Sequence, residues 1–184
     1  NAHGFVDQAD GVLLCSAALA DSLGIPDKKR VYLHGAAAGN DHWYVSERDA
    51  MHRSPAIRAV TGRTLERAGL TVGEIDHFDL YSCFPSAIEI ACRELGLDED
   101  DPRNVTVTCG LPFFGGPGNN YVTHSIATMV ERVRAAPRSL GLVMANASYP
   151  AKPAAGVSST TPLTVPCVHH PSHAPPASRD ERQT

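Results

Sequence analysis

Short apolar runs alternate along the chain with longer stretches in which apolar residues recur at the period of a helix. The short runs predict buried strands at 11–15, 30–34, 105–108 and 140–144, with a final strand near 156–158. The segment 77–82 alternates between apolar and polar residues, which predicts another strand. Strands that alternate with helices in this order are typical of an α/β layered domain.

Two helices have clear start and stop signals in the sequence. Ser54 and Pro55 supply an N-cap and a first-turn proline, and Gly69 is expected to end the helix that they begin. Pro85 begins a second helix, which ends at Gly96. Further helices are predicted for about 16–23 and for 122–133, and a capping box is predicted for Thr71 and Glu74.

The remaining segments are predicted to be loops and a tail. Residues 35–53 form a long surface excursion, and 109–120 form a glycine-rich loop between a strand and a helix. After Pro162 the composition changes to Pro, Ser, His and charged residues, which bury too little apolar area to offset the entropy lost on ordering. We therefore expect one domain over 1–162 and a disordered tail over 163–184.

Composition and charge argue against nucleic acids and membranes as partners. The 184 residues carry a formal net charge of −4 with a pI near 6.1, and they show no basic stripe for nucleic acid or an anionic membrane. No apolar stretch approaches the roughly 18 residues of a membrane span. Five irregularly spaced cysteines favour reduced thiols in the cytoplasm. The start at Asn1 suggests a fragment or a processed piece.

Several motifs in fixed order resemble the C-terminal half of a thiolase. The start, Asn1 to Gly4 followed by Asp7, resembles the Asn-x-x-Gly-x-x-Asp segment that opens that half. Cys83 and Phe84 match the end of the His-Asp-Cys-Phe motif in the sterol-carrier branch of the superfamily. The strings at 81–86 and 119–124 are shared with actinobacterial thiolase-like proteins labelled acetyl-CoA acetyltransferases.

The resemblance implies a fold and an activity. The fold would be a layered half with a mixed five-stranded sheet and helices on both faces. The activity would be acyl transfer in lipid metabolism, with a coenzyme A thioester as substrate and no further cofactor. The acylated cysteine of the family lies in a first half, so the expected partners are acyl-CoA and either that half or a second copy. A non-catalytic acyl-CoA-binding subunit and a gene remnant stay open as alternatives.

The resemblance also indicates candidate site residues. The acid–base and hydrogen-bonding candidates are His124, Cys83 and Tyr81, and Cys83 is expected to have a lowered pKa at the start of the 85–95 helix. The residues expected to line the substrate are Phe84, Gly115, Gly116, Pro117, Asn119 and Asn120. Gly116 stands where thiolases have a catalytic histidine, and 145–148 lacks their second cysteine.

The tail contains the one cysteine–histidine cluster of the sequence. It consists of Cys167, His169, His170 and His173, which are all residue types that bind zinc. Their spacing differs from that of structural zinc fingers, and they lie in the segment that is predicted to be disordered. We therefore expect no metal site.

Overall fold

The computed structural model describes residues 2–98 and 100–163. Almost all of the tail that is predicted to be disordered, and all four of its candidate metal ligands, lie outside these residues. The domain boundary near 162 therefore stays a prediction. Within the described part of the chain, none of the helices has the length and apolar character to cross a bilayer.

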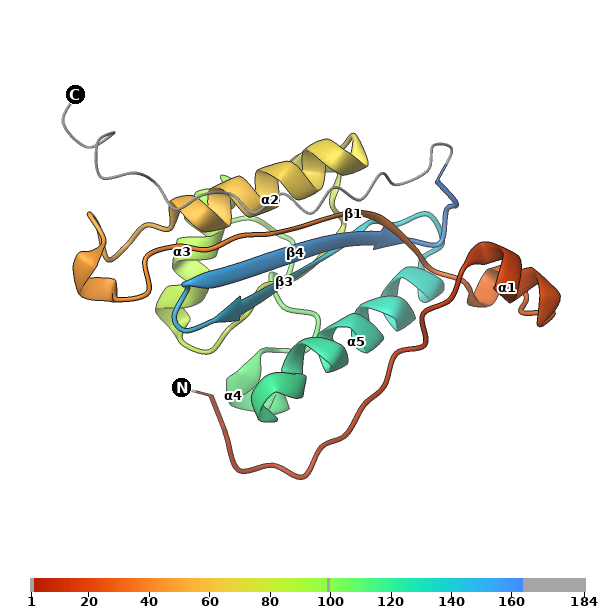
Figure 1. The fold of residues 1–184 in the computed structure, drawn as a ribbon, viewed down its shortest axis with the longest axis horizontal. Helices are drawn as coiled ribbons and strands as arrows, with labels where there is room; N and C mark the ends of the chain where they lie inside the picture. The colour runs from red at the N-terminus through yellow and green to blue at the C-terminus, as the bar shows by residue number, and fades with distance from the viewer. Residues whose placement is uncertain (1, 99, 164–184) are drawn as a thin grey trace.

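Four strands form one mixed sheet (Figure 1). They are β1 (Tyr32–Ala38), β2 (His77–Asp79), β3 (Gly141–Ala147) and β4 (Lys152–Ser159), in the spatial order β1-β4-β3-β2. β4 pairs antiparallel with both β1 and β3, whereas β2 and β3 are parallel. The α/β class and the mixed sheet are confirmed, with four strands in the described residues instead of five.

Residues 105–108 do not form the strand that their apolar pattern predicts. They make a single β-bridge, in which Thr106 pairs with Asp79. The amide of Thr106 donates to Asn104 Oδ1 at 3.3 Å, and that of Thr108 donates to Asp79 Oδ1 at 3.2 Å. Because side chains take these two donors, they are not available for a ladder of backbone hydrogen bonds.

The strand predicted at 11–15 is also absent. This segment has no regular secondary structure, and Leu13 and Leu14 are 99% and 93% exposed. A strand needs a neighbouring strand to satisfy its backbone donors and acceptors, and none of the described strands pairs with it. The prediction is wrong because an apolar run indicates which side chains could be buried, but it does not show whether another strand pairs with the backbone.

Helices cover both faces of the sheet, as predicted (Figure 1). On one face, α2 (Pro55–Ala68) packs on β1 and β4, with α3 (Pro85–Leu95) beside it. On the other face, α5 (Tyr121–Ala135) packs mainly on β3. The short helices are α1 (Ala17–Ser22), α4 (Leu111–Phe114), η1 (Asp27–Lys29), η2 (Val45–Glu47), η3 (Val72–Glu74) and η4 (Gly118–Asn120).

The predicted helix ends are confirmed by their caps. Ser54 Oγ accepts a hydrogen bond from the amide of Ile57 at 3.4 Å, and Pro55 occupies the first turn. Gly69 and Gly96 end α2 and α3 in the left-handed region, which glycine adopts without steric cost. The capping box of Thr71 and Glu74 is present, although it caps the 3₁₀ helix η3.

A close approach of helix to strand fixes α2 on the sheet. A β-carbon on Gly35 of β1 would overlap the carbonyl oxygen of Thr64 and would lie 3.2 Å from the β-carbon of Ala68. Glycine at this position lets the two backbones come into contact. The main core cluster lies beneath α2 and α3, and its largest members include Ile57, Phe78, Leu80, Leu142 and Met144.

A buried carboxylate joins the end of α3 to the start of α2. The side chain of Glu94 is fully buried, and its Oε1 accepts from the Ser54 amide at 3.1 Å and from Arg53 Nε at 2.9 Å. Its Oε2 lies 2.8 Å from Arg58 Nε. A negative charge beside the first turn of α2 also complements the helix dipole. Glu94 therefore stabilises the pair of helices that covers the core.

Candidate active site

The loops after β2 and β3 meet at one edge of the sheet. These two strands are parallel, so their carboxyl ends lie at the same edge, where α/β folds commonly place their sites. The ring of Tyr149, from the loop after β3, packs edge-on against Phe84 with 5.4 Å between centroids. Its hydroxyl lies 2.7 Å from Ser86 Oγ at the start of α3. Phe84, 44% exposed, thus stands between the two loops.

A buried polar network shapes the turn that opens the glycine-rich loop. Asp79 Oδ1 accepts from the amide of Thr108 and, at 2.9 Å, from its hydroxyl. Because that hydroxyl donates to Asp79, the Tyr121 hydroxyl at 2.6 Å donates to Thr108 Oγ1. The amide of Gly110 donates to the same oxygen at 3.2 Å. Between them, Cys109 is exposed and has a positive φ of 67°.

Burial changes the ionisation of this network. Loss of hydration raises the pKa of Asp79, and its hydrogen bonds from Ser125 and Thr108 oppose that rise. Loss of hydration, together with the negative charge of Asp79, raises the pKa of Tyr121 to about 12. Tyr121 is therefore a neutral donor at physiological pH.

The raised pKa of Asp79 predicts a pH dependence of stability. Between the unfolded value of about 3.9 and the higher folded value, the folded chain keeps a proton that the unfolded chain has lost, so the free energy of unfolding falls as pH rises. Each unit of elevation is worth about 1.4 kcal/mol. Asp79→Asn keeps an oxygen for Thr108 but does not titrate, so its curve should lack this fall.

Urea unfolding of the wild type and Asp79→Asn between pH 4 and pH 8 measures this difference. Asp7→Asn, which removes an exposed carboxylate, is the matched control and should run parallel to the wild type. Curves for Asp79→Asn that also run parallel to the wild type would show that Asp79 ionises normally.

An extended segment at the start of the chain, residues 2–10, lies across both candidate loops; we call it the N-terminal strap. The amide of Ala2 donates to the carbonyl of Cys83 at 3.3 Å. The carbonyl of His3 accepts from the amide of Gly116 at 2.8 Å. The strap therefore bridges the loop after β2 and the glycine-rich loop.

The side chains of Val6 and Gln8 attach the strap to the end of α4. Gln8 Nε2 donates to the carbonyl of Phe114 at 2.7 Å. Gly115 has a φ of 102°, and a β-carbon there would stand 2.9 Å from Val6 Cγ1. Glycine at 115 therefore serves the contact with the strap, which is a structural reason for its presence beside any role toward substrate.

His124 lies in the first turns of α5 under the end of the strap. It is 7% exposed, and its Nδ1 is 3.3 Å from Asp10 Oδ2. Its Nε2 is 3.3 Å from Asn120 Nδ2. The ring of Phe114 packs against the imidazole, with 5.4 Å between centroids. His124 thus has a carboxylate on one nitrogen and an amide on the other.

Cys83 and Tyr81 are both held in their neutral forms. Burial raises the pKa of the Cys83 thiol by more than nearby backbone amides lower it, so the expectation of a lowered pKa is wrong. The start of α3 does not offset the loss of water around this half-buried sulfur. Burial also raises the pKa of Tyr81, whose ring packs edge-on against Tyr121 at 5.4 Å.

The other candidates differ in their surroundings. Asn120 contacts His124 and is half-buried, whereas Asn119 is exposed. Gly116 is tied to the strap, and Pro117 precedes the 3₁₀ turn η4. The structure thus brings Gly115, Gly116, Asn120 and His124 together around the strap.

Three important residues escaped sequence reasoning. Gln8 and Asp10 lie just before the apolar run that predicts a strand at 11–15, and Asp79 is a polar position of the alternating strand predicted for 77–82. A signal existed for Asp79, since it stands two residues before Tyr81, between the apolar residues Phe78 and Leu80. Asp10 carries no such signal, because its partner is more than a hundred residues away in sequence.

Metal ligands do not gather in the part of the chain that the structure describes. No group of three or more His, Cys, Asp or Glu side chains there has a suitable arrangement.

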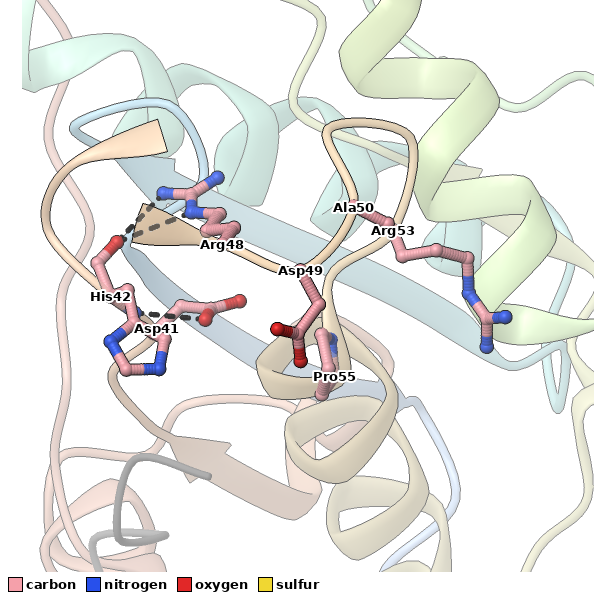
Figure 2. A pocket seen from close by; sticks show the side chains of 7 residues that line it. All are labelled: Asp41, His42, Arg48, Asp49, Ala50, Arg53 and Pro55. Carbon is pink, nitrogen blue, oxygen red and sulfur yellow. Dashed lines mark hydrogen bonds between the residues drawn. The ribbon is translucent and has the colours of Figure 1, made fainter. Parts of the chain in front are cut away.

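A separate pocket of about 240 Å³ lies between the 39–53 loop and the start of α2 (Figure 2). Figure 2 shows Arg48 and Arg53 extending away from each other, Arg48 toward the carbonyl of His42 and Arg53 toward α3. Arg48 also donates to the carbonyl of Tyr149 at 2.7 Å. The pocket lies outside the predicted site, and Arg48 connects its wall to the loop after β3.

No family model and no curated protein matches the sequence. A solved structure does: the crystal structure of a monomeric SCP2-thiolase-like protein type 1 from Mycobacterium smegmatis, at 42% identity and a TM-score of 0.75. The match covers 79% of this chain and 32% of that chain, so this chain spans about a third of its relative. Together with the mixed sheet between two helical layers, this similarity establishes that the chain has a thiolase-like fold.

Proposed function

We propose that this chain supplies the C-terminal part of a thiolase-type acyl-CoA acyltransferase, with acetyl-CoA as the simplest substrate. The single observation that carries the proposal is His124, a buried imidazole paired with Asp10 beside the loops that the thiolase resemblance marks as substrate-lining. An imidazole that contacts a carboxylate is a suitable proton acceptor for carbon–carbon bond formation.

The proposed reaction needs a nucleophile, a base and hydrogen-bond donors. The nucleophile is a cysteine of a first half, either in the same polypeptide or in a partner. Its thiolate attacks the carbonyl carbon of acyl-CoA, and the acyl–sulfur bond breaks to release the thiolate of coenzyme A. In the second step His124 removes a proton from the carbon next to a thioester carbonyl. The electron pair of the broken C–H bond then attacks the carbonyl carbon of the acyl group on the cysteine, which forms a carbon–carbon bond and displaces the cysteine thiolate.

Neutral side chains near the loop after β2 suit the role of donors. Raised pKa values keep the Tyr81 hydroxyl and the Cys83 thiol protonated, so each can donate to a thioester oxygen as charge develops there. This assigns Cys83 a supporting role rather than that of a thiolate nucleophile. The four described cysteines are free thiols, which suits our proposal of a cytoplasmic location.

A second candidate is a subunit that binds acyl-CoA without transferring the acyl group. The end of β3 and the start of the loop after it favour this candidate, since 145–148, where the thiolase resemblance places a second cysteine, contains none. Gly116 likewise presents no side chain where thiolases have histidine. Under this candidate the loops would hold the thioester, and His124 would act only through hydrogen bonding.

Calorimetric titration of this chain with acetyl-CoA tests what the two candidates share. Saturable heat that free coenzyme A reproduces only weakly would indicate recognition of the thioester. Absence of binding, in a chain whose circular dichroism shows it folded, would contradict both candidates.

Acyl exchange between acetyl-CoA and isotopically labelled coenzyme A separates the candidates. It should be measured on the native gene product that contains this sequence. Under the acyltransferase proposal, His124→Gln should slow condensation of two acetyl groups by about 100-fold or more, the usual worth of a general base. His52→Gln, at an exposed position, is the matched control. Binding without exchange would support the non-catalytic candidate.

A further inference from the structure

We propose that Asp10 is a positioning residue that holds the neutral imidazole of His124 with its proton on Nδ1, leaving Nε2 as the proton acceptor. The inference deepens the proposed function by naming the basic atom and the residue that fixes it. It also makes the N-terminal strap, which carries Asp10, a part of the candidate active site.

The chemistry of the two neighbours selects this tautomer. The negative charge of an ionised carboxylate favours a proton on the ring nitrogen nearest to it, so Asp10 Oδ2, 3.3 Å from Nδ1, favours a proton on that nitrogen. An amide nitrogen only donates, so Asn120 Nδ2, 3.3 Å from Nε2, requires a lone pair there. Two independent contacts therefore specify the same arrangement of the ring.

The carboxylate of Asp10 is itself held in place. Its Oδ1 accepts from the amide of Gly11 at 2.7 Å, which leaves Oδ2 to face the imidazole. Two residues earlier, Gln8 binds the carbonyl of Phe114, so the backbone on this side of Asp10 is attached to α4. Asp10 retains 28% side-chain exposure, whereas His124 is 7% exposed.

Proton transfer changes the hydrogen-bond partner that Nε2 needs, from a donor to an acceptor. When Nε2 takes a proton from a substrate carbon, the lone pair forms the new N–H bond and the ring becomes an imidazolium. Asp10 then faces a positive charge, which its own negative charge stabilises. Asn120 would have to turn its amide so that Oδ1, instead of Nδ2, faces the new N–H. Asn120 is half-buried and can rotate about its side-chain bonds.

Nitrogen-15 spectra of the chain, recorded without any thioester, test the tautomer directly. Long-range proton–nitrogen spectra distinguish a protonated ring nitrogen from one with a lone pair, and His124→Gln identifies the signals by their loss. In the wild type at mildly alkaline pH, we expect Nδ1 to carry the proton. Asp10→Ala should give a mixture containing the Nε2–H form, and Asp7→Ala should leave the spectrum unchanged.

An exchange of partners provides a second test. Asp10→Asn combined with Asn120→Asp places the carboxylate beside Nε2 and the amide beside Nδ1, so the Nε2–H tautomer should predominate. A wild-type ring with Nε2–H, or an Asp10→Ala variant with an unchanged tautomer, would overturn the inference. Because these spectra need no turnover, the inference can stand where acyl exchange is absent, and exchange can occur where the inference fails.

Discussion

Alanine in place of Gly35 is expected to lower the free energy of unfolding by about 3 kcal/mol. The added β-carbon meets the backbone carbonyl of Thr64, and a backbone atom within a helix cannot move aside as the end of a flexible side chain can. α2 must then shift away from β1, which opens the core that it covers. Chemical denaturation of the purified variant measures the loss.

Gly62 provides a matched control within α2. A β-carbon at this exposed position meets nothing within 4 Å, and glycine in a helix costs about 0.5 to 1 kcal/mol relative to alanine. Gly62→Ala should therefore stabilise the chain by about that amount. A Gly35→Ala variant as stable as the wild type would mean that α2 does not approach β1 as closely as the structure shows.

Removal of the Glu94 carboxylate should have an effect of similar size. Glu94→Ala leaves the buried amide of Ser54 without its acceptor, at a cost of about 1 to 3 kcal/mol, and leaves a void between α2 and α3. Arg53 and Arg58 remain partly exposed to water, which limits the cost of losing their partner. We expect a total loss of about 3 kcal/mol in urea unfolding.

Two further variants identify the cause of that loss. Glu94→Gln keeps an oxygen for the Ser54 amide and fills the same volume, so it should lose clearly less stability than Glu94→Ala. Glu89→Ala, at an exposed position of the same helix, should change stability by less than about 0.5 kcal/mol. Equal losses for Glu94→Ala and Glu94→Gln would indicate that the charge, and not the hydrogen bond or the packing, is what matters.

Helices were predictable from the sequence because their ends depend on local chemistry. Ser54 with Pro55 at a start, and Gly69 or Gly96 at an end, act through neighbouring backbone groups, so a short window of sequence contains the whole cause. The strands were less predictable, since a strand exists only where another pairs with it. Residues 11–15 and 105–108 have apolar side chains typical of strands, but their backbones do not form a ladder of hydrogen bonds with a neighbouring strand.

The alternation of 77–82 correctly predicted a strand, but its polar position does not face solvent. Phe78, Asp79 and Leu80 are all fully buried, because helices cover both faces of the sheet and leave no solvent side. The polar position in the pattern therefore marks a buried carboxyl group with its own hydrogen bonds. For the candidate site, sequence comparison selected His124, but its contact with Asp10 depends on how the strap crosses the fold.

The order of the strands bears on how the chain acquires its structure during synthesis. β4 lies between β1 and β3, and the pairing of Tyr32 with Ser159 joins distant parts of the sequence. A chain emerging from the ribosome therefore exposes the apolar side of α2 and an unpaired β1 until β4 has been made. Folding should be slow and late, and nascent chains that stop before β4 should depend on chaperones to remain soluble.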